Sequence, residues 1–512
     1  MNVASSKNLG KAWPWAVILI FFAFSFLSAV LVGTGQFLLA GALFVFIALA
    51  TVSLLFMSTQ GIADRRGFLL IVVWCVMLFT NGMQQSGGVP VGYVLELLTF
   101  GLVLASAQCV SKLAGQDGVL RVLLILLACH FAVALLSSML GRSHTFAALW
   151  QLQYNLKWPL MFAVGTMLIW NERVDDLMRK IILWSWVLIA PILALEITMP
   201  GVHSQVFGVN PDGQVNPFFG VGARYRGPFN HAGYLAIISA LLVTGAMAQL
   251  ISGRGRSWGW IALIYTVFVL LSGQRQELFA MAFALLLFAV IVWRQYLHLL
   301  LLITSLLGGL LVTSFVYFDY IPMQSTLAEW GLLDDFLSHR SERAIITDHG
   351  IDIARQFFPL GSGLGTYGGP GAQKFDLSLF WELGFGRYWW FLQGKFILDT
   401  YWPNIMAESG FIGAAFLMIF FAVLWVTLLR RAWRSVGTSD YRAALLALAA
   451  LTLLLANTPS SPMLTDPRGA FIFWLIIGSA WRSTMPKYSK RRLDRAYAAP
   501  ARDASTRMEA AI

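Results

Sequence analysis

Long apolar segments separated by short polar turns run along most of this chain. A membrane-spanning helix needs about 20 apolar residues to cross a bilayer. The 14 candidate segments are Trp15–Val32, Phe37–Met57, Phe68–Asn81, Val91–Val110, Val119–Leu140, Phe146–Trp170, Ile181–Met199, Ala232–Ile251, Trp258–Ser272, Leu278–Trp293, Tyr296–Phe318, Ile405–Leu429, Ala443–Ala456 and Gly469–Trp481. We therefore expect an all-α integral membrane protein, a polytopic helical bundle with about 14 transmembrane helices.

The composition also indicates a membrane protein. The 512 residues are 58% hydrophobic and 12% charged, and their mean hydropathy is +0.70. A soluble chain of this length has no interior large enough to hide so much apolar surface. The cysteines Cys75, Cys109 and Cys129 lie in apolar segments without metal-ligand spacing, so we expect neither a disulfide nor a zinc site. Lys7 and Lys11 precede the first segment without a small-residue cleavage site, which predicts a retained helix.

The basic residues fall on one side when the N-terminus is placed inside and the segments alternate. The groups on this side are Asp64-Arg65-Arg66, Lys112 with Arg121, Arg173 with Arg179 and Lys180, Arg254 with Arg256, Arg294, Arg430 with Arg431 and Arg434, and the tail from Lys487 to Arg495. Cytoplasmic loops of membrane proteins carry such an excess. It accounts for the net charge of +11 without a nucleic-acid partner. We expect a multi-pass membrane protein with both termini cytoplasmic, and in a bacterium the opposite side is the periplasm or the cell exterior.

The same alternation divides the chain into six regions. They are N-terminal transmembrane helices (1–199), an extracytoplasmic loop (200–231), core transmembrane helices (232–318), a large periplasmic loop (319–404), C-terminal transmembrane helices (405–482) and a basic cytoplasmic tail (483–512). Connections longer than about 15 residues are usually functional or folded, so we expect the large loop to be partly helical and to hold the site. The polar, alanine-rich residues 497–512 are expected to be disordered.

Several arginines lie on the predicted outer side, against the general charge pattern. They are Arg224, Arg226, Arg275, Arg340, Arg343, Arg355, Arg387 and Arg468. A guanidinium group matches phosphate oxygens in bidentate fashion, which favours a lipid-linked phosphate or pyrophosphate ligand. The alternative is ordinary surface charge, above all for Arg387 and Arg468. Arg275 lies in a hairpin of a few residues at the membrane boundary, where an ionisable group is costly. A structural pair with Glu277 is the alternative there.

Candidate acid-base and sugar-binding side chains lie in the same loops. Asp399 and Glu408 flank the re-entry into the membrane and are candidate general bases. His231 and His349 are candidates from residue type alone, and a single histidine is more often structural. The aromatic residues between Phe380 and Trp402, with Tyr401 among them, fit sugar stacking, and they fit an interfacial aromatic belt equally well.

Several nucleotide-dependent activities lack their motifs. Gly363-Leu364-Gly365-Thr366-Tyr367-Gly368 matches the dinucleotide pattern, but Gly369-Pro370-Gly371 follows where a helix should begin. We expect instead a glycine-rich turn near substrate or a flexible loop. The chain contains no P-loop and no Asp-x-Asp motif, so we expect neither nucleotide hydrolysis nor a metal or other cofactor.

Three motifs together carry a family resemblance. They are Arg226-Gly227-Pro228-Phe229-Asn230-His231, Leu271-Ser272-Gly273-Gln274-Arg275, and Pro359 to Gly365 with a closing stretch from Asp399 to Gly413. On these residues the region from Arg224 to Leu429 resembles the O-antigen polymerase and ligase superfamily. The resemblance implies a membrane glycosyltransferase that joins undecaprenyl-pyrophosphate-linked glycans outside the inner membrane. Members of this family usually work beside a flippase and a chain-length regulator.

One departure separates the two branches of this family. Its ligases typically carry a His-Asn pair about nine residues before the Glu-x-Gly of the exit helix, whereas this chain has Asp399-Thr400 there. An acidic residue at this place is typical of the polymerases, so the departure favours a polymerase of exopolysaccharide or O-antigen repeat units.

The resemblance implies roles for the candidate residues. Arg226, Arg275 and Arg343 would bind the pyrophosphate, and Asp399 would activate the attacking hydroxyl, with Glu408 as the alternative. The other expected substrate contacts are Arg224, His231, Arg340, Arg355, Tyr401 and Trp402. Three alternatives stay open: a ligase, a polysaccharide flippase or transporter, and a non-catalytic component of an envelope complex.

Overall fold

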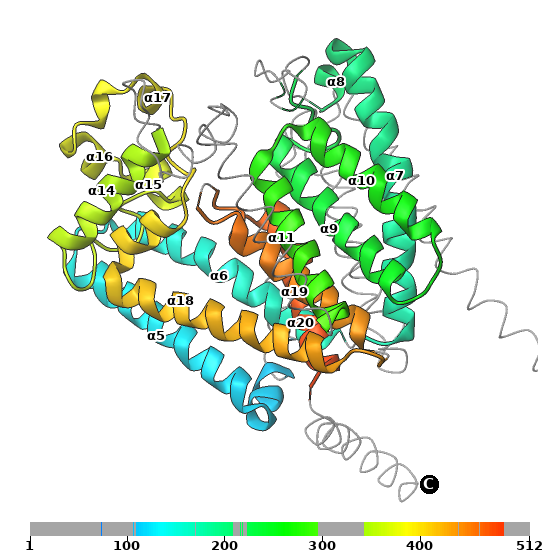
Figure 1. Cartoon of the computed structure of the whole chain (residues 1–512). Helices are drawn as coiled ribbons and strands as arrows, with labels where there is room; N and C mark the ends of the chain where they lie inside the picture. Colours follow the sequence, from blue (N-terminus) through cyan, green and yellow to red (C-terminus); the bar gives the residue numbers. More distant parts are fainter. Residues whose placement is uncertain are drawn as a thin grey trace, which may run out of the picture.

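The computed structural model describes residues 109–485 apart from 169, 208–215, 217, 219–222, 295–341, 439 and 460, together with the single positions 73 and 106. The regular elements among these residues are all helices (Figure 1). The first four predicted spans and Tyr296–Phe318 lie outside the described residues, apart from a few positions. The same holds for the predicted disordered tail.

In the described part of the chain, nine long helices form the bundle, and each overlaps a predicted span. They are α5 (Gly118–Leu140), α6 (Thr145–Met167), α7 (Glu172–Thr198), α9 (Ala232–Ile251), α10 (Ser257–Ser272), α11 (Arg275–Val292), α18 (Trp402–Arg434), α19 (Tyr441–Ala456) and α20 (Pro467–Ser483). Five of them, α5, α7, α9, α11 and α18, are long and apolar enough to cross a bilayer, and α10 and α19 are apolar but shorter. The described part of the chain is therefore all-helical, with helices that match those of a membrane protein in length and composition.

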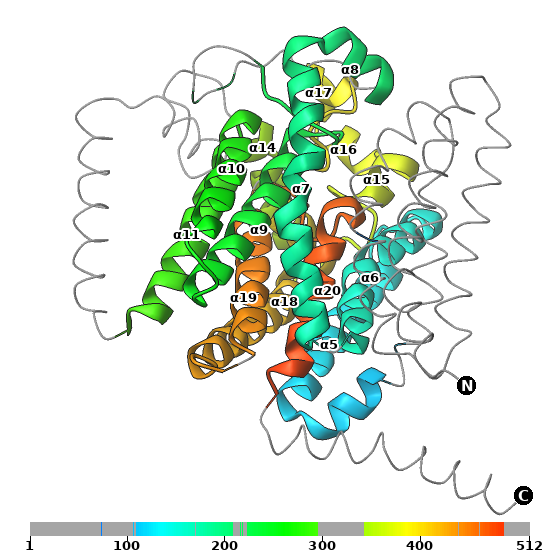
Figure 2. The same ribbon diagram turned by 90° about the vertical axis from the view of Figure 1, so that its right-hand side faces the viewer.

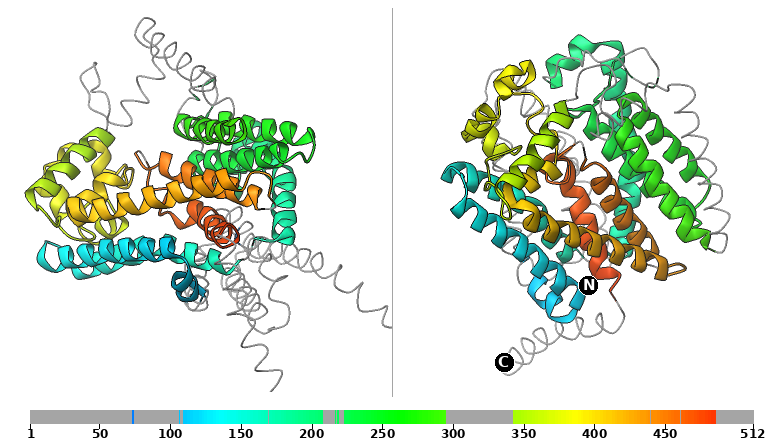
Figure 3. Two further views of the ribbon diagram at one scale, coloured as in Figure 1. Left: turned by 60° about the horizontal axis from the view of Figure 1, so that its bottom comes forward. Right: turned by 60° about the vertical axis from the view of Figure 1, so that its left-hand side comes forward.

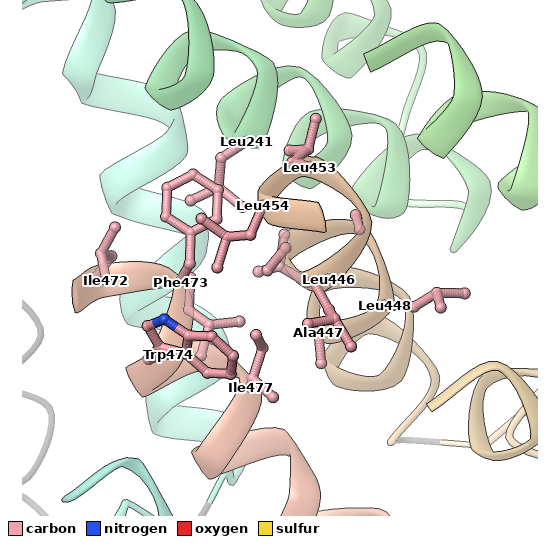
Figure 4. Close-up of a cluster of buried hydrophobic side chains, with 14 of the residues drawn as sticks. Leu241, Leu446, Ala447, Leu448, Leu453, Leu454, Ile472, Phe473, Trp474 and Ile477 are labelled. Atoms are coloured by element: carbon pink, nitrogen blue, oxygen red, sulfur yellow. The ribbon is translucent and has the colours of Figure 1, made fainter. Parts of the chain in front are cut away.

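Helices α9, α19 and α20 form the centre of the bundle. Large side chains from all three, among them Leu241, Leu453 and Trp474, interlock there (Figure 4). The surrounding helices expose large apolar side chains instead, such as Met139 on α5 and Trp260 on α10. A helix that is apolar on all sides belongs in an interior, whereas exposed apolar faces suit contact with lipid tails.

Basic residues gather at one end of the bundle. Asp175, at the start of α7, accepts hydrogen bonds from Arg254 and Arg442, which lie in the turn after α9 and at the start of α19. Asp117 caps α5 and pairs with Arg431, near the end of α18. From this end α7 runs the length of the bundle to the short helix α8 (Pro200–Phe207) at the other end (Figure 2). Which end faces the cytoplasm stays a prediction.

Residues 342–401 form a compact unit at the opposite end, which we call the loop domain. Its elements are α14 (Glu342–Gln356), α15 (Pro370–Phe375), α16 (Ser378–Glu382), the 3-10 helix η3 (Phe385–Arg387) and α17 (Trp389–Leu392). An aromatic cluster that includes Tyr367, Phe380 and Phe385 fills its interior. The unit lies beside the start of α18, which runs alongside α5 (Figures 1 and 3).

Candidate functional site

An ion pair joins two predicted site residues where the loop domain meets the membrane helices. Nη2 of Arg343, in the first turn of α14, donates to Oδ2 of Asp399 at 3.1 Å. The two residues are 56 positions apart in the chain, so only the fold brings them together. Their side chains are 25% and 32% exposed, so both charged groups remain within reach of a ligand.

The backbone before Asp399 is strained. Phe396 has φ 63°, the one positive φ among the described residues other than glycine. A bulky residue rarely adopts this conformation, and such outliers gather at binding and catalytic sites. The strained turn is closed by the amide of Asp399, which donates to the carbonyl oxygen of Phe396 at 3.0 Å. The turn thereby fixes the direction in which the side chain of Asp399 points.

Helix α18 is broken just after Glu408, and the break receives the glycine-rich segment. Gly410 has φ 64° and ψ −177°, outside the helical region. Beside the break, the carbonyl oxygens of Ala407 and Glu408 accept from the backbone amides of Ser362 at 2.8 Å and Gly363 at 3.0 Å. A broken helix is tolerated in a membrane protein where neighbouring groups satisfy its free backbone atoms in this way.

The glycine-rich segment 361–369 is buried along its whole length. It lies between α18 and the start of α6, and the amide of Leu364 donates to Oγ of Ser138 at 2.9 Å. The alternative prediction of a flexible loop is therefore wrong, because close backbone contacts on both sides hold this segment in place. Glycine is required at Gly361 and Gly410, since a Cβ on either residue would overlap the backbone of the other segment.

The carboxylate of Glu408 holds this segment. Its Oε1 accepts from the backbone amide of Gly365 at 2.8 Å and from that of Tyr367 at 3.4 Å. The side chain is only 1% exposed. A carboxylate enclosed in this way has no open path to a sugar hydroxyl, which favours a positioning role. Of the two candidate general bases, Asp399 has the more accessible position.

The predicted arginine segment before α9 lies against the end of α10. The amide of Tyr225 donates to the carbonyl oxygen of Leu271 at 3.2 Å, four residues before Arg275. The carboxylate of Glu196, on α7, accepts from the amides of Arg226 and Gly227 at 2.9 and 2.7 Å. The chain turns between α10 and α11 through Gly273 and Gln274, a shorter turn than predicted, so Arg275 is the first residue of α11. The fold thus brings the segments that carry Arg224, Arg226 and Arg275 to one place.

The connection between α19 and α20 joins the two groups of predicted residues. From the arginine side, Nε2 of Gln276 donates to the carbonyl oxygen of Ala456 at 3.1 Å. From the loop-domain side, Nε1 of Trp402 donates to Oγ1 of Thr458 at 2.9 Å. Ala456 and Thr458 are two residues apart, so the starts of α11 and α18 are held to the same short stretch. The candidate site spans this junction.

The remaining predicted residues have more varied positions. His231 caps α9, and its Nδ1 accepts from the amide of Gly233 at 3.0 Å. Tyr401 is 3% exposed, and burial raises the pKa of its hydroxyl. Arg355 lies at the far end of α14 from Arg343 and pairs with Asp352 at 3.1 Å. Arg340 lies outside the described residues.

Sequence reasoning missed two carboxylates that shape the site. Glu196 was not singled out, although an acidic residue inside an apolar span is itself a functional signal. Asp466 accepts a hydrogen bond from the hydroxyl of Tyr234, at the start of α9. No local pattern marks Asp466, because its partner is 232 residues away. Among the described residues, no three His, Cys, Asp or Glu side chains gather closely enough to hold a metal ion.

The fold and site define a class: a helical membrane protein that carries a folded loop domain at one end of its bundle. Beyond this class, the chain matches no protein-family model and no curated protein. The resemblance to the O-antigen polymerase and ligase superfamily therefore rests on the motifs between residues 224 and 429, and the activity that it implies is a proposal.

Proposed function

We propose that this protein is a membrane glycosyltransferase that polymerises undecaprenyl-pyrophosphate-linked repeat units into exopolysaccharide or O-antigen at the periplasmic face of the inner membrane. The observation that carries the proposal is the Arg343–Asp399 pair at the junction of the loop domain and α18. A guanidinium beside a carboxylate, both partly exposed, supplies an anion-binding group and a proton acceptor in one place.

The chemistry is a single displacement. The hydroxyl oxygen of the acceptor sugar forms a bond to the anomeric carbon of the donor glycan. The bond from that carbon to the pyrophosphate oxygen breaks with its electron pair, and undecaprenyl pyrophosphate leaves. Asp399 takes the hydroxyl proton. Pyrophosphate is a good leaving group, so the main demand is to stabilise its negative charge.

The arginines would meet that demand. Arg343 exchanges its bond to Asp399 for the pyrophosphate, which frees the carboxylate for the acceptor hydroxyl. Arg226 and Arg275 approach the ligand from the other side of the junction. Preorganised donors in such a site contribute about 3–4 kcal/mol each to stabilising the transition state. Loss of one donor is therefore expected to slow the reaction by about 100-fold or more.

The test is glycan length in a deletion strain complemented with wild type, Arg343→Ala, Arg275→Ala or Asp399→Asn. Each variant is first checked for normal abundance in the membrane. The matched controls are Arg142→Ala and Glu382→Gln, which break an exposed ion pair between the turn after α5 and the loop domain that involves neither Arg343 nor Asp399. We expect single lipid-linked units to accumulate outside the membrane in the deletion strain. Long polymer should return with wild type and both controls, and with none of the three site variants.

Other patterns would contradict this proposal. Units trapped on the cytoplasmic side would indicate a flippase. Long polymer that forms but stays on its lipid carrier would indicate a ligase. Site variants that restore full polymer length at normal abundance would indicate a scaffold of an envelope complex.

A further inference from the structure

A cleft opens on the loop domain, along helix α14. Its volume is about 860 Å³, within the range of 300–1,000 Å³ that is typical of ligand sites. One wall is α14, and the other is the segment from Arg387 to Trp390. Neither Arg343 nor Asp399 lines it, so the cleft is separate from the ion pair at the junction.

The spacing of residues on α14 explains its polar wall. Asp348, Asp352 and Arg355 recur every three or four positions, so they share one face of the helix. On another face, Ile346 and Ile353 are buried in the aromatic cluster of the domain. The apolar face of this amphipathic helix therefore packs against the domain, and its charged face lines the cleft.

The opposite wall is aromatic. Tyr388 and Trp390 stack with their ring centroids 5.3 Å apart and their planes at 15°, and Trp390 is only 3% exposed. Trp389 between them is 58% exposed. The buried rings hold this wall rigid, and the exposed indole of Trp389, with Nζ of Lys395 5.6 Å from its ring centroid, lines the cleft beside them. The apolar face of a sugar ring stacks on such a side chain at little cost in conformational freedom.

Three acidic and two basic side chains line the cleft, so carboxylates are in slight excess. Glu342, Asp348 and Asp352 face Arg355 and Arg387. Burial lowers the pKa of His349, which also lines the cleft, so its ring is neutral near pH 7. The cleft therefore offers hydrogen-bond donors and acceptors without a net positive charge. This suits uncharged hydroxyl-rich ligands and disfavours pyrophosphate, uronic acids and anionic lipid headgroups.

We propose that this cleft binds uncharged sugar units of the glycan, away from the bond that reacts. The identity of this glycan rests on the proposed function, whereas the preference for uncharged sugars rests on the cleft itself. Helix α14 links the two sites, because Arg343 lies in its first turn beside Glu342, which lines the cleft, and the lining continues to Arg355, about 18 Å further along the axis. A glycan whose reacting end lies at the junction can extend along this helix into the cleft.

The test measures binding to the full-length protein in lipid nanodiscs by isothermal titration calorimetry. The probe is a set of oligosaccharides released by partial acid hydrolysis from the surface polysaccharide of the producing organism, and separated by anion exchange into uncharged and acidic fractions. The variants are Trp389→Ala and Asp352→Asn. The matched control is Trp381→Ala, since Trp381 belongs to the same domain, is 55% exposed and lies outside the cleft.

We expect the uncharged fraction to bind, and Trp389→Ala to weaken its binding by about tenfold, as lost stacking on one ring implies. Asp352→Asn should weaken it severalfold, and Trp381→Ala should leave it within about twofold of wild type. The proposal is overturned if the wild type binds neither fraction, if the acidic fraction binds better, or if the two tryptophan variants behave alike. Melting temperatures of both variants equal to that of wild type exclude a folding defect.

The two proposals can fail separately. Asp399→Asn should abolish polymer formation and leave oligosaccharide binding unchanged. If deletion of the gene leaves polymer length normal but Trp389→Ala still weakens binding, the proposed function is wrong and the sugar cleft stands. If polymer formation needs Asp399 but Trp389→Ala binds like wild type, the cleft proposal alone is wrong.

Discussion

Glu408 illustrates how one carboxylate can organise a site without reacting. Because its Oε1 accepts from the amides of Gly365 and Tyr367, its removal would leave two buried donors unsatisfied. Each costs about 1–3 kcal/mol. We expect Glu408→Ala to lower the melting temperature of the purified protein markedly. Glu408→Gln keeps an acceptor oxygen and should retain most of the stability and the polymerising activity.

The glutamine variant separates the two roles of Glu408. A general base cannot be replaced by an amide, so a catalytic Glu408 would make Glu408→Gln inactive at normal stability. That result would restore the original hypothesis that Glu408 can act as the base. An active Glu408→Gln beside an inactive Asp399→Asn would assign the proton transfer to Asp399.

His349 gives the loop domain a dependence on pH. Burial is the largest cause that lowers its pKa in the folded protein, with Arg387 acting in the same direction and the nearby Asp352 and Asp348 against it. The unfolded chain, with a pKa of about 6.5, therefore takes up the proton first as the pH falls. Stability is full above this value and declines below it. Melting temperatures between pH 8 and pH 5 should fall less for His349→Gln than for wild type; parallel curves would contradict this.

At the scale of single residues, sequence reasoning found charged groups but not their partners. Asp399 and Arg343 were identified because charge is rare in this chain and costly near a membrane. The role of Glu408 could not be predicted, since its amide partners lie 43 and 41 positions earlier in the chain. The position of a charged residue in the sequence identifies it as a candidate site residue, and only its contacts in the folded protein assign its role.

At the scale of elements, the break in α18 is the feature most open to test. A Cβ at Gly410 would overlap the carbonyl oxygen of Pro359, and the residue also has a positive φ. Gly437 has a positive φ of 80° but nothing within 4 Å of an added Cβ, so Gly437→Ala is a matched control for backbone strain alone. That strain costs about 1–2 kcal/mol. We expect Gly410→Ala to lose clearly more stability, measured by the melting temperature and yield in detergent.

Similar losses in Gly410→Ala and Gly437→Ala would contradict a close backbone contact at the break. If the contact is real, a second change that removes bulk cannot rescue Gly410→Ala, because the obstructing atoms belong to the backbone of Pro359 and Leu360.

Hydropathy predicted the helices far better than their irregularities. The span Ala232–Ile251 coincides with α9, and Trp258–Ser272 differs from α10 by one residue. By contrast, α18 begins at Trp402, three residues before the predicted start, and its break leaves no mark on the apolar pattern. Helix α8 lies in the segment 200–231, which was predicted as an extracytoplasmic loop. An average over many residues locates a helix, whereas a break depends on the segment that packs against it.

At the scale of the whole molecule, the orientation in the membrane can be measured directly. Gln393 is exposed on the loop domain, and Thr438 is exposed in the turn between α18 and α19 at the basic end. In a background without Cys75, Cys109 and Cys129, we expect Gln393→Cys to react with a membrane-impermeant maleimide in intact spheroplasts. Thr438→Cys should react only after permeabilisation, because cytoplasmic ends carry the excess of basic residues.

The reverse labelling pattern would be decisive against the proposed function. It would place the Arg343–Asp399 pair in the cytoplasm, on the wrong side of the membrane for units that have already been flipped. Labelling of both positions in intact spheroplasts would indicate leaky cells, which a cytoplasmic marker enzyme released into the medium reveals.

The contact between Gly361 and Gly410 has a consequence for how this protein can diversify. These two residues are 49 positions apart in the chain, yet their backbones touch, so the stretch between them leaves the bundle and returns at nearly the same point. Segments whose ends meet tolerate insertion, deletion and exchange without disturbing their host. A related chain could therefore vary the aromatic wall of the cleft, Arg387 to Trp390, which lies within this stretch, while α14 with Arg343 stays unchanged.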